Sequence, residues 1–154
     1  MSFPRTIDVF DETGTGRVAA AVAALAVASD VITLAGDLGA GKTAFARGFL
    51  RARGVTGEVP SPTFTLVQLY ETQGSLIYHF DLYRLARAED AFELGIEEAF
   101  ADGISLIEWP ERLGPFLPAA RLDIALGFGT TESARSIALT PSDAWSARLE
   151  HFHV

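Results

Sequence analysis

The chain has 154 residues, of which 49% are hydrophobic, and this length and composition predict one domain, residues 1–154, with a substantial core. Its formal net charge is −8 at pH 7, so most of its surface would repel a long nucleic acid and stand-alone RNA binding is disfavoured. The absence of cysteine excludes disulfides, thiolate catalysis and zinc-thiolate sites, and it fits a reducing compartment.

The first part of the chain predicts neither an export signal nor a membrane anchor. The opening residues MSFPRTIDVFDET contain no apolar signal core, and the Ala-rich run at 18–28 is too short to span a bilayer. We expect this run to form a core helix, capped by Asp11, Thr13 or Thr15. A soluble, cytoplasmic protein is therefore expected.

A glycine-rich loop, GDLGAGKT at 36–43, contains the only lysine of the chain, beside eleven arginines elsewhere. The loop follows the pattern G-x-x-x-x-G-K-[ST], in which backbone N–H groups surround a polyphosphate. The compact ammonium of Lys42 can reach between the β- and γ-phosphates, and the hydroxyl of Thr43 can bind Mg²⁺. The residues expected to bind the nucleotide are Gly36, Asp37, Leu38, Gly39, Ala40, Gly41, Lys42, Thr43 and Ala44.

The segments on both sides of this loop support the interpretation. Residues 31–35 are mostly β-branched or apolar, as in a buried parallel strand. Residues 42–53 carry apolar side chains at helical spacing, with Gly54 as an end cap. A strand, the loop and a helix in that order direct the positive end of the helix dipole at the phosphates. The sequence therefore predicts a P-loop site for a nucleotide and Mg²⁺.

The rest of the chain alternates predicted strands and helices. In order, these are a hairpin of strands at 65–70 and 76–80 joined by ETQGS, one helix or two short ones over 86–101 interrupted near Gly95, a buried strand at 104–107, two strands at 121–127 and 133–139, and a last helix opened by Thr140-Pro141. This pattern predicts an α/β, P-loop NTPase-like fold of three layers, with a mainly parallel central sheet and flanking antiparallel strands.

Two predicted strands end in an acid that could complete the nucleotide site. In P-loop proteins, an acid at the carboxyl end of a neighbouring strand holds the metal. The strand at 104–107 is continuously apolar, as a central parallel strand would be, so Glu108 is the metal candidate, directly or through water. Asp81 ends the hairpin arm and could contact the metal or position the attacking water. The division of roles between the two acids stays open.

Other residues near these acids carry weaker signals. The turn Ser61-Pro62-Thr63-Phe64 is either a switch that senses the γ-phosphate or a plain connector. Trp109 follows the metal candidate and would place a fluorophore near the nucleotide, although packing is its commoner role. His79 is interpreted as a structural hydrogen-bonding residue. The pattern places no obvious arginine finger, and Arg84 and Arg112 are only candidates, so hydrolysis by the isolated chain should be slow.

Five motifs together resemble the TsaE (YjeE) family of small bacterial P-loop ATPases. They are GDLGAGKT, SPTFTLVQLYE, YHFDLYRL, ELGIEEAF and LIEWPERL, in family order and spacing, and they extend over nearly the whole chain. The resemblance implies an Mg²⁺-dependent ATPase that works with the TsaB and TsaD proteins to make N6-threonylcarbamoyladenosine at position 37 of tRNAs reading codons that begin with A. The partners, rather than this acidic chain, would bring the tRNA.

The same resemblance implies roles for individual residues. It assigns ATP and Mg²⁺ binding to Lys42 and Thr43, metal binding to Glu108, a part in hydrolysis to Asp81, switch-like behaviour to residues 61–64, and a place near the base to Thr15. Many relatives read G-K-T-T, whereas Ala44 follows Thr43 here. One hydroxyl at the α-phosphate is therefore missing, and nucleotide affinity is expected to be weaker.

Two functions of other classes stay open. A small-molecule P-loop kinase would need an acceptor pocket and an arginine-rich lid, and no such lid is apparent between residues 86 and 118. A nucleotide-gated binding module would need ATP bound but not hydrolysed. A GTPase is disfavoured, because the chain contains no asparagine and so cannot carry an N-K-x-D motif.

Overall fold

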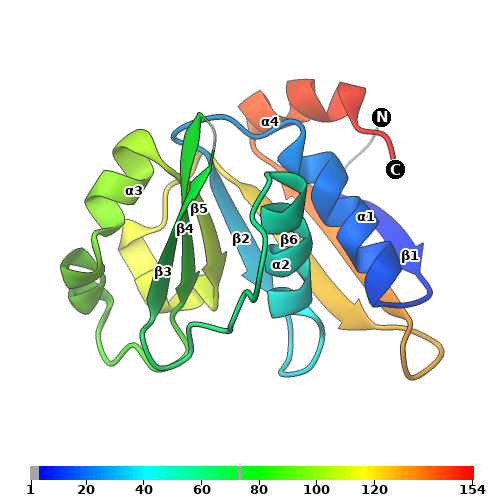
Figure 1. The fold of residues 1–154 in the computed structure, drawn as a ribbon, viewed down its shortest axis with the longest axis horizontal. Helices are drawn as coiled ribbons and strands as arrows, with labels where there is room; N and C mark the ends of the chain where they lie inside the picture. The colour runs from blue at the N-terminus through cyan, green and yellow to red at the C-terminus, as the bar shows by residue number, and fades with distance from the viewer. Residues whose placement is uncertain (1–3, 73) are drawn as a thin grey trace.

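The computed structural model describes residues 4–72 and 74–154, in which seven strands form one sheet with helices on both faces (Figure 1). The strands are β1 (Arg5–Val9), β2 (Val31–Ala35), β3 (Val67–Thr72), β4 (Ser75–Asp81), β5 (Ile104–Glu108), β6 (Leu122–Phe128) and β7 (Arg135–Pro141). The helices are α1 (Glu12–Ala23), α2 (Lys42–Ala52), α3 (Ile96–Asp102) and α4 (Asp143–Arg148), with 3₁₀ segments η1 (Ala88–Leu94), η2 (Pro110–Phe116) and η3 (Leu149–His151).

The centre of the sheet is parallel and its margins are antiparallel, as the sequence predicts. The strand order is β1-β7-β6-β2-β5-β4-β3, in which β6, β2, β5 and β4 pair in parallel and the other strands pair antiparallel. The register places Glu108 of β5 between Leu34 of β2 and Asp81 of β4. The carboxyl ends of three parallel strands therefore meet at one edge of the sheet.

Apolar side chains from the helices cover both faces of this sheet. On one face α1, α2 and α4 contribute Val18, Phe49 and Trp145 to the core that contains β2 and β5 side chains. On the other face η1, α3 and η2 contribute Ala91, Ile96 and Leu113 to a second apolar cluster. Because both faces are buried, β2 and β5 carry continuous apolar runs rather than alternating ones.

The two ends of the described chain differ from the predicted elements. Asp11, one of the three predicted caps, accepts a hydrogen bond from the Gly14 N–H at 3.0 Å, so the cap is confirmed. The helix runs over Glu12–Ala23 and ends before the predicted Ala-rich run does, since that run extends to residue 28. No strand is predicted for Arg5–Val9, which forms β1 by pairing with β7, a contact between opposite ends of the chain. Thr140-Pro141 ends β7, and the last helix begins later, at Asp143.

The middle of the chain follows the prediction more closely. Residues 86–101 contain two short helical segments, η1 and α3, separated by Gly95 in the left-handed conformation with φ 81°. The hairpin of β3 and β4 forms, although Gln73 of the predicted ETQGS turn lies outside the described residues, as do residues 1–3 of the N-terminal segment. Over residues 4–72 and 74–154, none of the helices has the length and apolar character needed to cross a membrane.

Candidate functional site

The glycine-rich loop leaves the carboxyl end of β2 and enters α2, at the edge of the sheet where Asp81 and Glu108 lie. Gly36, Gly39 and Gly41 have φ values of 145°, 83° and 107°, a range that residues with a β-carbon rarely adopt. At Gly36 a β-carbon would also lie 2.4 Å from the Leu126 carbonyl oxygen. The glycines therefore permit both the turn and its close approach to β6.

Lys42 begins α2 with its side chain folded back on the loop. It is only 5% exposed, and its Nζ donates to the carbonyl oxygens of Gly36 at 2.6 Å and Asp37 at 3.0 Å. Burial lowers the pKa of the ammonium below its usual 10.5, and the negative charges of four nearby acids oppose this shift, in decreasing order Glu108, Asp81, Asp37 and Glu111. The side chain is therefore a desolvated cation in an acidic surrounding.

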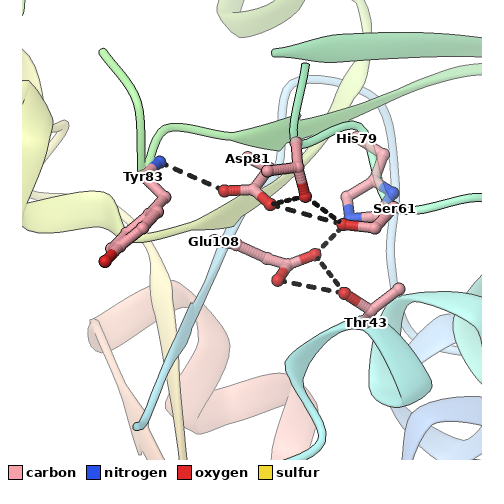
Figure 2. A network of polar contacts seen from close by, with 7 residues as sticks. Thr43, Ser61, His79, Asp81, Tyr83 and Glu108 are labelled. Carbon is pink, nitrogen blue, oxygen red and sulfur yellow. Dashed lines mark hydrogen bonds and ion pairs between the residues drawn. The ribbon is translucent and has the colours of Figure 1, made fainter. Parts of the chain in front are cut away.

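Thr43 and Glu108 are joined directly, as Figure 2 shows. The Thr43 hydroxyl lies 3.2 Å from Oε1 and 3.1 Å from Oε2 of Glu108, and it donates to this carboxylate. The carboxylate is 3% exposed and also contacts Nε2 of His79 at 2.7 Å. Since the hydroxyl proton is directed at Glu108, the lone pairs of Thr43 are free to bind a cation.

Asp81 is tied to the turn at 61–64 rather than to Thr43. Its Oδ1 accepts from the backbone N–H of Tyr83 at 3.1 Å, and its Oδ2 accepts from the hydroxyls of Thr63 at 3.2 Å and Ser61 at 3.4 Å (Figure 2). Phe64 of the same turn is 82% exposed. The turn therefore directs its polar side chains toward the site and its aromatic ring toward solvent.

Two adjoining cavities surround this cluster. One has a volume of about 240 Å³ and is lined by Leu38, Gly39, Gly41, Lys42, Thr43, Ala44, Ser61, Thr63, Asp81, Glu108 and Trp109. The second has a volume of about 310 Å³ and is lined by Glu12, Thr15, Gly39, Gly41, Ala44, Ser133 and Arg135. Gly39, Gly41 and Ala44 line both, so the two cavities meet where the glycine-rich loop enters α2.

Most of the predicted site residues come together here, and a few do not line either cavity. The guanidinium of Arg112 lies 6.0 Å from the ring centroid of Tyr83, and that of Arg84 lies 4.7 Å from the ring centroid of Phe64. Pro62, within the turn, is buried. Gly36, Asp37 and Ala40 shape the loop through their backbone without lining the cavities.

Arg135 is a residue of the site that sequence reasoning misses. Its guanidinium donates to the carbonyl oxygens of Ala40 at 3.2 Å and Gly39 at 3.3 Å, and it lines the second cavity. It lies 95 residues from Ala40 in the chain, so no local pattern indicates the contact. For His79, by contrast, a signal exists: the residue precedes Asp81 by two positions, and alternate strand residues share one face.

The oxygen groups around the first cavity fit Mg²⁺, a cation that prefers hydroxyl, carboxylate and phosphate oxygens. Thr43, Glu108 and Asp81 supply one hydroxyl and two carboxylates on its wall. The residues that the structure describes contain no cluster of three or more His, Asp or Glu side chains that could hold a metal ion by themselves.

Comparison with known proteins agrees with this architecture, an α/β sheet whose glycine-rich loop faces two strand-end carboxylates. The family model described as "Threonylcarbamoyl adenosine biosynthesis protein TsaE" matches residues 9–137. The chain therefore belongs to the TsaE family, which confirms the resemblance of its five motifs.

Individual relatives give the same result. The chain is 48% identical over 110 residues to the tRNA threonylcarbamoyladenosine biosynthesis protein TsaE of Haemophilus influenzae, with 71% of this chain and 68% of that protein covered. It is 42% identical over 113 residues to the TsaE protein of Bacillus subtilis, covering 73% and 70% of the two chains. The crystal structure of Bacillus subtilis YdiB matches with a TM-score of 0.77 and 30% identity, over 95% of this chain and 91% of that one.

Proposed function

We propose that this chain is a Mg²⁺-dependent, P-loop ATPase subunit required for the N6-threonylcarbamoyladenosine modification of tRNA, acting in the cytoplasm with TsaB and TsaD. Membership of the TsaE family supports the pathway, since the relatives are named for threonylcarbamoyladenosine biosynthesis. The observation that carries the ATPase assignment is the convergence of Lys42, Thr43, Asp81 and Glu108 on one cavity beside the glycine-rich loop.

The two adjoining cavities suit the two parts of a nucleotide. The triphosphate would enter the cavity that holds Lys42, where the ammonium can meet its oxygens and the α2 N-terminus adds a positive dipole end. The base would lie in the neighbouring cavity, which Thr15 and Ala44 line. Ala44 lines both cavities and offers no hydroxyl to the α-phosphate, so the affinity should depend mainly on the β- and γ-phosphate contacts.

The polar network then assigns a part to each side chain. Thr43 and Glu108 would hold Mg²⁺, with Glu108 acting directly or through water. Glu108 would at the same time accept a hydrogen bond from the Thr43 hydroxyl. Mg²⁺, when bound, neutralises charge on the β- and γ-phosphates. Asp81 faces the same cavity from β4 and would orient the attacking water or the metal's water shell. Ser61 and Thr63 would link the state of the γ-phosphate to the turn through Asp81.

Hydrolysis by the isolated chain should be slow. Lys42 is the cation on the wall of the first cavity, whereas the two candidate arginine fingers, Arg84 and Arg112, lie over the aromatic rings of Phe64 and Tyr83. A transition state that gathers charge on the γ-phosphate is usually stabilised by a further cation. The partners would supply or reposition that charge, and they would also bring the tRNA to this acidic chain.

The proposal is tested by phosphate release from ATP and Mg²⁺, measured for the full chain alone and with TsaB and TsaD added. We expect a low rate that increases with the partners and disappears in Lys42→Ala. Arg51→Ala is the matched control, because it removes one exposed cation from the same helix. An unchanged rate in Lys42→Ala would refute the ATPase assignment.

The products separate the remaining functions. Phosphate transferred to a metabolite, instead of released to water, would identify a kinase. An Asp81→Asn variant that binds ATP, does not hydrolyse it and still supports tRNA modification would identify a nucleotide-gated binding module.

A further inference from the structure

We propose that His79 is a positioning residue for the metal site: it holds the Glu108 carboxylate in the orientation that receives the Thr43 hydroxyl. This inference rests on the proposed Mg²⁺–nucleotide site and adds to it a residue that does not itself line the cavity. Sequence reasoning treats His79 only as a structural hydrogen-bonding residue of a strand.

The sheet register brings His79 beneath Glu108. In the parallel pair of β4 and β5, Asp81 lies beside Glu108 and His79 lies beside Leu106, two residues further into the sheet. Alternate residues of a strand share a face, so His79, Asp81 and Glu108 point to the same side. The imidazole is completely buried, and its Nε2 lies 2.7 Å from Oε2 of Glu108 (Figure 2).

The surroundings of the ring favour one tautomer. Nδ1 of His79 is buried and has no hydrogen-bond partner among the residues that the structure describes. A proton on Nδ1 would leave an unpaired N–H in the interior, which proteins tolerate less readily than an unpaired acceptor. The ring therefore carries a proton on Nε2, and this N–H donates a hydrogen bond to Glu108.

The Glu108 carboxylate has donors on two sides. The Thr43 hydroxyl lies 3.2 Å from Oε1 and 3.1 Å from Oε2, and Nε2 of His79 lies 2.7 Å from Oε2. The shorter contact, from a completely buried ring, holds the carboxylate from within the sheet while Thr43 approaches it from α2. Outer residues that orient ligands in this way typically change metal affinity by about 10- to 100-fold when they are replaced.

Two substitutions of His79 test the position of the donor. The amide nitrogen of glutamine can reach the place of Nε2, whereas that of asparagine reaches only the place of Nδ1. We expect His79→Asn to weaken binding of Mn²⁺, a stand-in for Mg²⁺, by about 10- to 100-fold. His79→Gln should restore most of the affinity. Binding is measured on the full chain with ADP present, from the loss of the free Mn²⁺ signal in electron paramagnetic resonance.

Controls separate positioning from folding. Ser105→Ala changes another fully buried polar residue of the neighbouring strand β5, and it should leave Mn²⁺ binding unchanged. ADP affinity in the presence of EDTA should be equal in all variants. Equal losses of Mn²⁺ affinity in His79→Gln and His79→Asn, or no loss in either, would overturn the inference. If the unsubstituted chain binds ADP but no Mn²⁺, the proposed function fails instead.

A measurement on the unsubstituted chain covers the case in which the variants do not fold. The chain has three histidines, so the ¹⁵N signals of their rings can be assigned and resolved by NMR. We expect the His79 ring to carry a proton on Nε2, both in the free chain and with Mg²⁺ and ADP bound. A ring with a proton on Nδ1 and none on Nε2 would overturn the inference.

Discussion

The ring of Trp109 lies over the ammonium of Lys42, with Nζ 4.4 Å from the ring centroid. Trp109 adopts the left-handed conformation, with φ 59° and ψ 53°, directly after Glu108. That conformation costs a non-glycine residue about 1–3 kcal/mol, so the surrounding structure must hold it. The ring of Tyr83 contacts the indole, and the two ring centroids are 4.9 Å apart. The indole thus covers the cation that we expect to meet the phosphates.

Nucleotide binding should therefore change the fluorescence of Trp109, because phosphates that reach Lys42 must displace the indole or alter its electrostatic surroundings. The chain has two tryptophans, and the other one, Trp145 of α4, is 2% exposed and packs into the core. A titration with Mg²⁺ and ATP should give a signal change in Trp145→Phe and none in Trp109→Phe. A signal change in Trp109→Phe and none in Trp145→Phe would show that the nucleotide binds elsewhere.

Lys42 should titrate below the ordinary pKa of lysine, 10.5, because burial disfavours its charged form. It is the only lysine, so the ¹⁵N signal of its side chain can be followed by NMR without overlap. Adding ATP should raise its pKa, because the phosphates place negative charge beside Nζ. A pKa that does not move on addition of saturating ATP would contradict contact between Lys42 and the phosphates.

The lowered pKa of Lys42 also predicts the sign of a pH effect on stability. Between that pKa and 10.5, the unfolded chain binds more protons at this position than the folded chain. The contribution of Lys42 to the free energy of unfolding therefore increases as pH rises through this window. We expect the free energy of unfolding of the native sequence to increase relative to that of Lys42→Met over the same range. The comparison cancels the titration of Tyr70, whose pKa burial raises. A difference that is constant with pH would contradict the shift.

Thr63→Val should slow hydrolysis while leaving ADP affinity nearly unchanged. The substitution removes the hydroxyl that lies 3.2 Å from Oδ2 of Asp81 and 2.8 Å from the Ser61 hydroxyl. We expect about a tenfold lower rate of phosphate release, which corresponds to about 1.4 kcal/mol in the barrier. Thr65→Val is the matched control, since Thr65 is an exposed residue of the same loop. Equal effects of the two substitutions would argue that the turn is a plain connector.

Three glycine substitutions should have graded effects on the free energy of unfolding in a denaturant titration. Gly36→Ala should be the most destabilising, because its β-carbon would lie 2.4 Å from the Leu126 carbonyl oxygen. Gly39→Ala has open space but a φ of 83°, so it should cost about 1–2 kcal/mol. Gly16→Ala, in α1, should stabilise by about 0.5–1 kcal/mol, because the added carbon has open space among the described residues outside its own helix backbone. A destabilising Gly16→Ala with a neutral Gly36→Ala would contradict the loop geometry.

The chemistry of the loop could be predicted from the sequence because each of its requirements is local. The spacing of Gly36, Gly41 and Lys42, and the apolar run before them, specify the turn and its cation without reference to the rest of the chain. The two acids were also predictable, since Asp81 and Glu108 each follow a run of strand-forming residues. The strand that ends in Glu108 was expected beside the strand that precedes the loop, and the sheet order confirms this; the position of β4 next to β5 was not predicted.

Only the tertiary structure decided how those residues are held. His79 meets Glu108 because β4 and β5 pair in one parallel register, and Arg135 meets Ala40 across 95 residues because β7 lies beyond β6. The strand at Arg5–Val9 likewise exists through its pairing with β7. Strand pairing depends on the packing of residues distant in the chain, whereas turn and helix propensities are set by neighbours. The sequence by itself determined the glycine-rich loop and the two strand-end acids, and the packed sheet determined which side chains orient them.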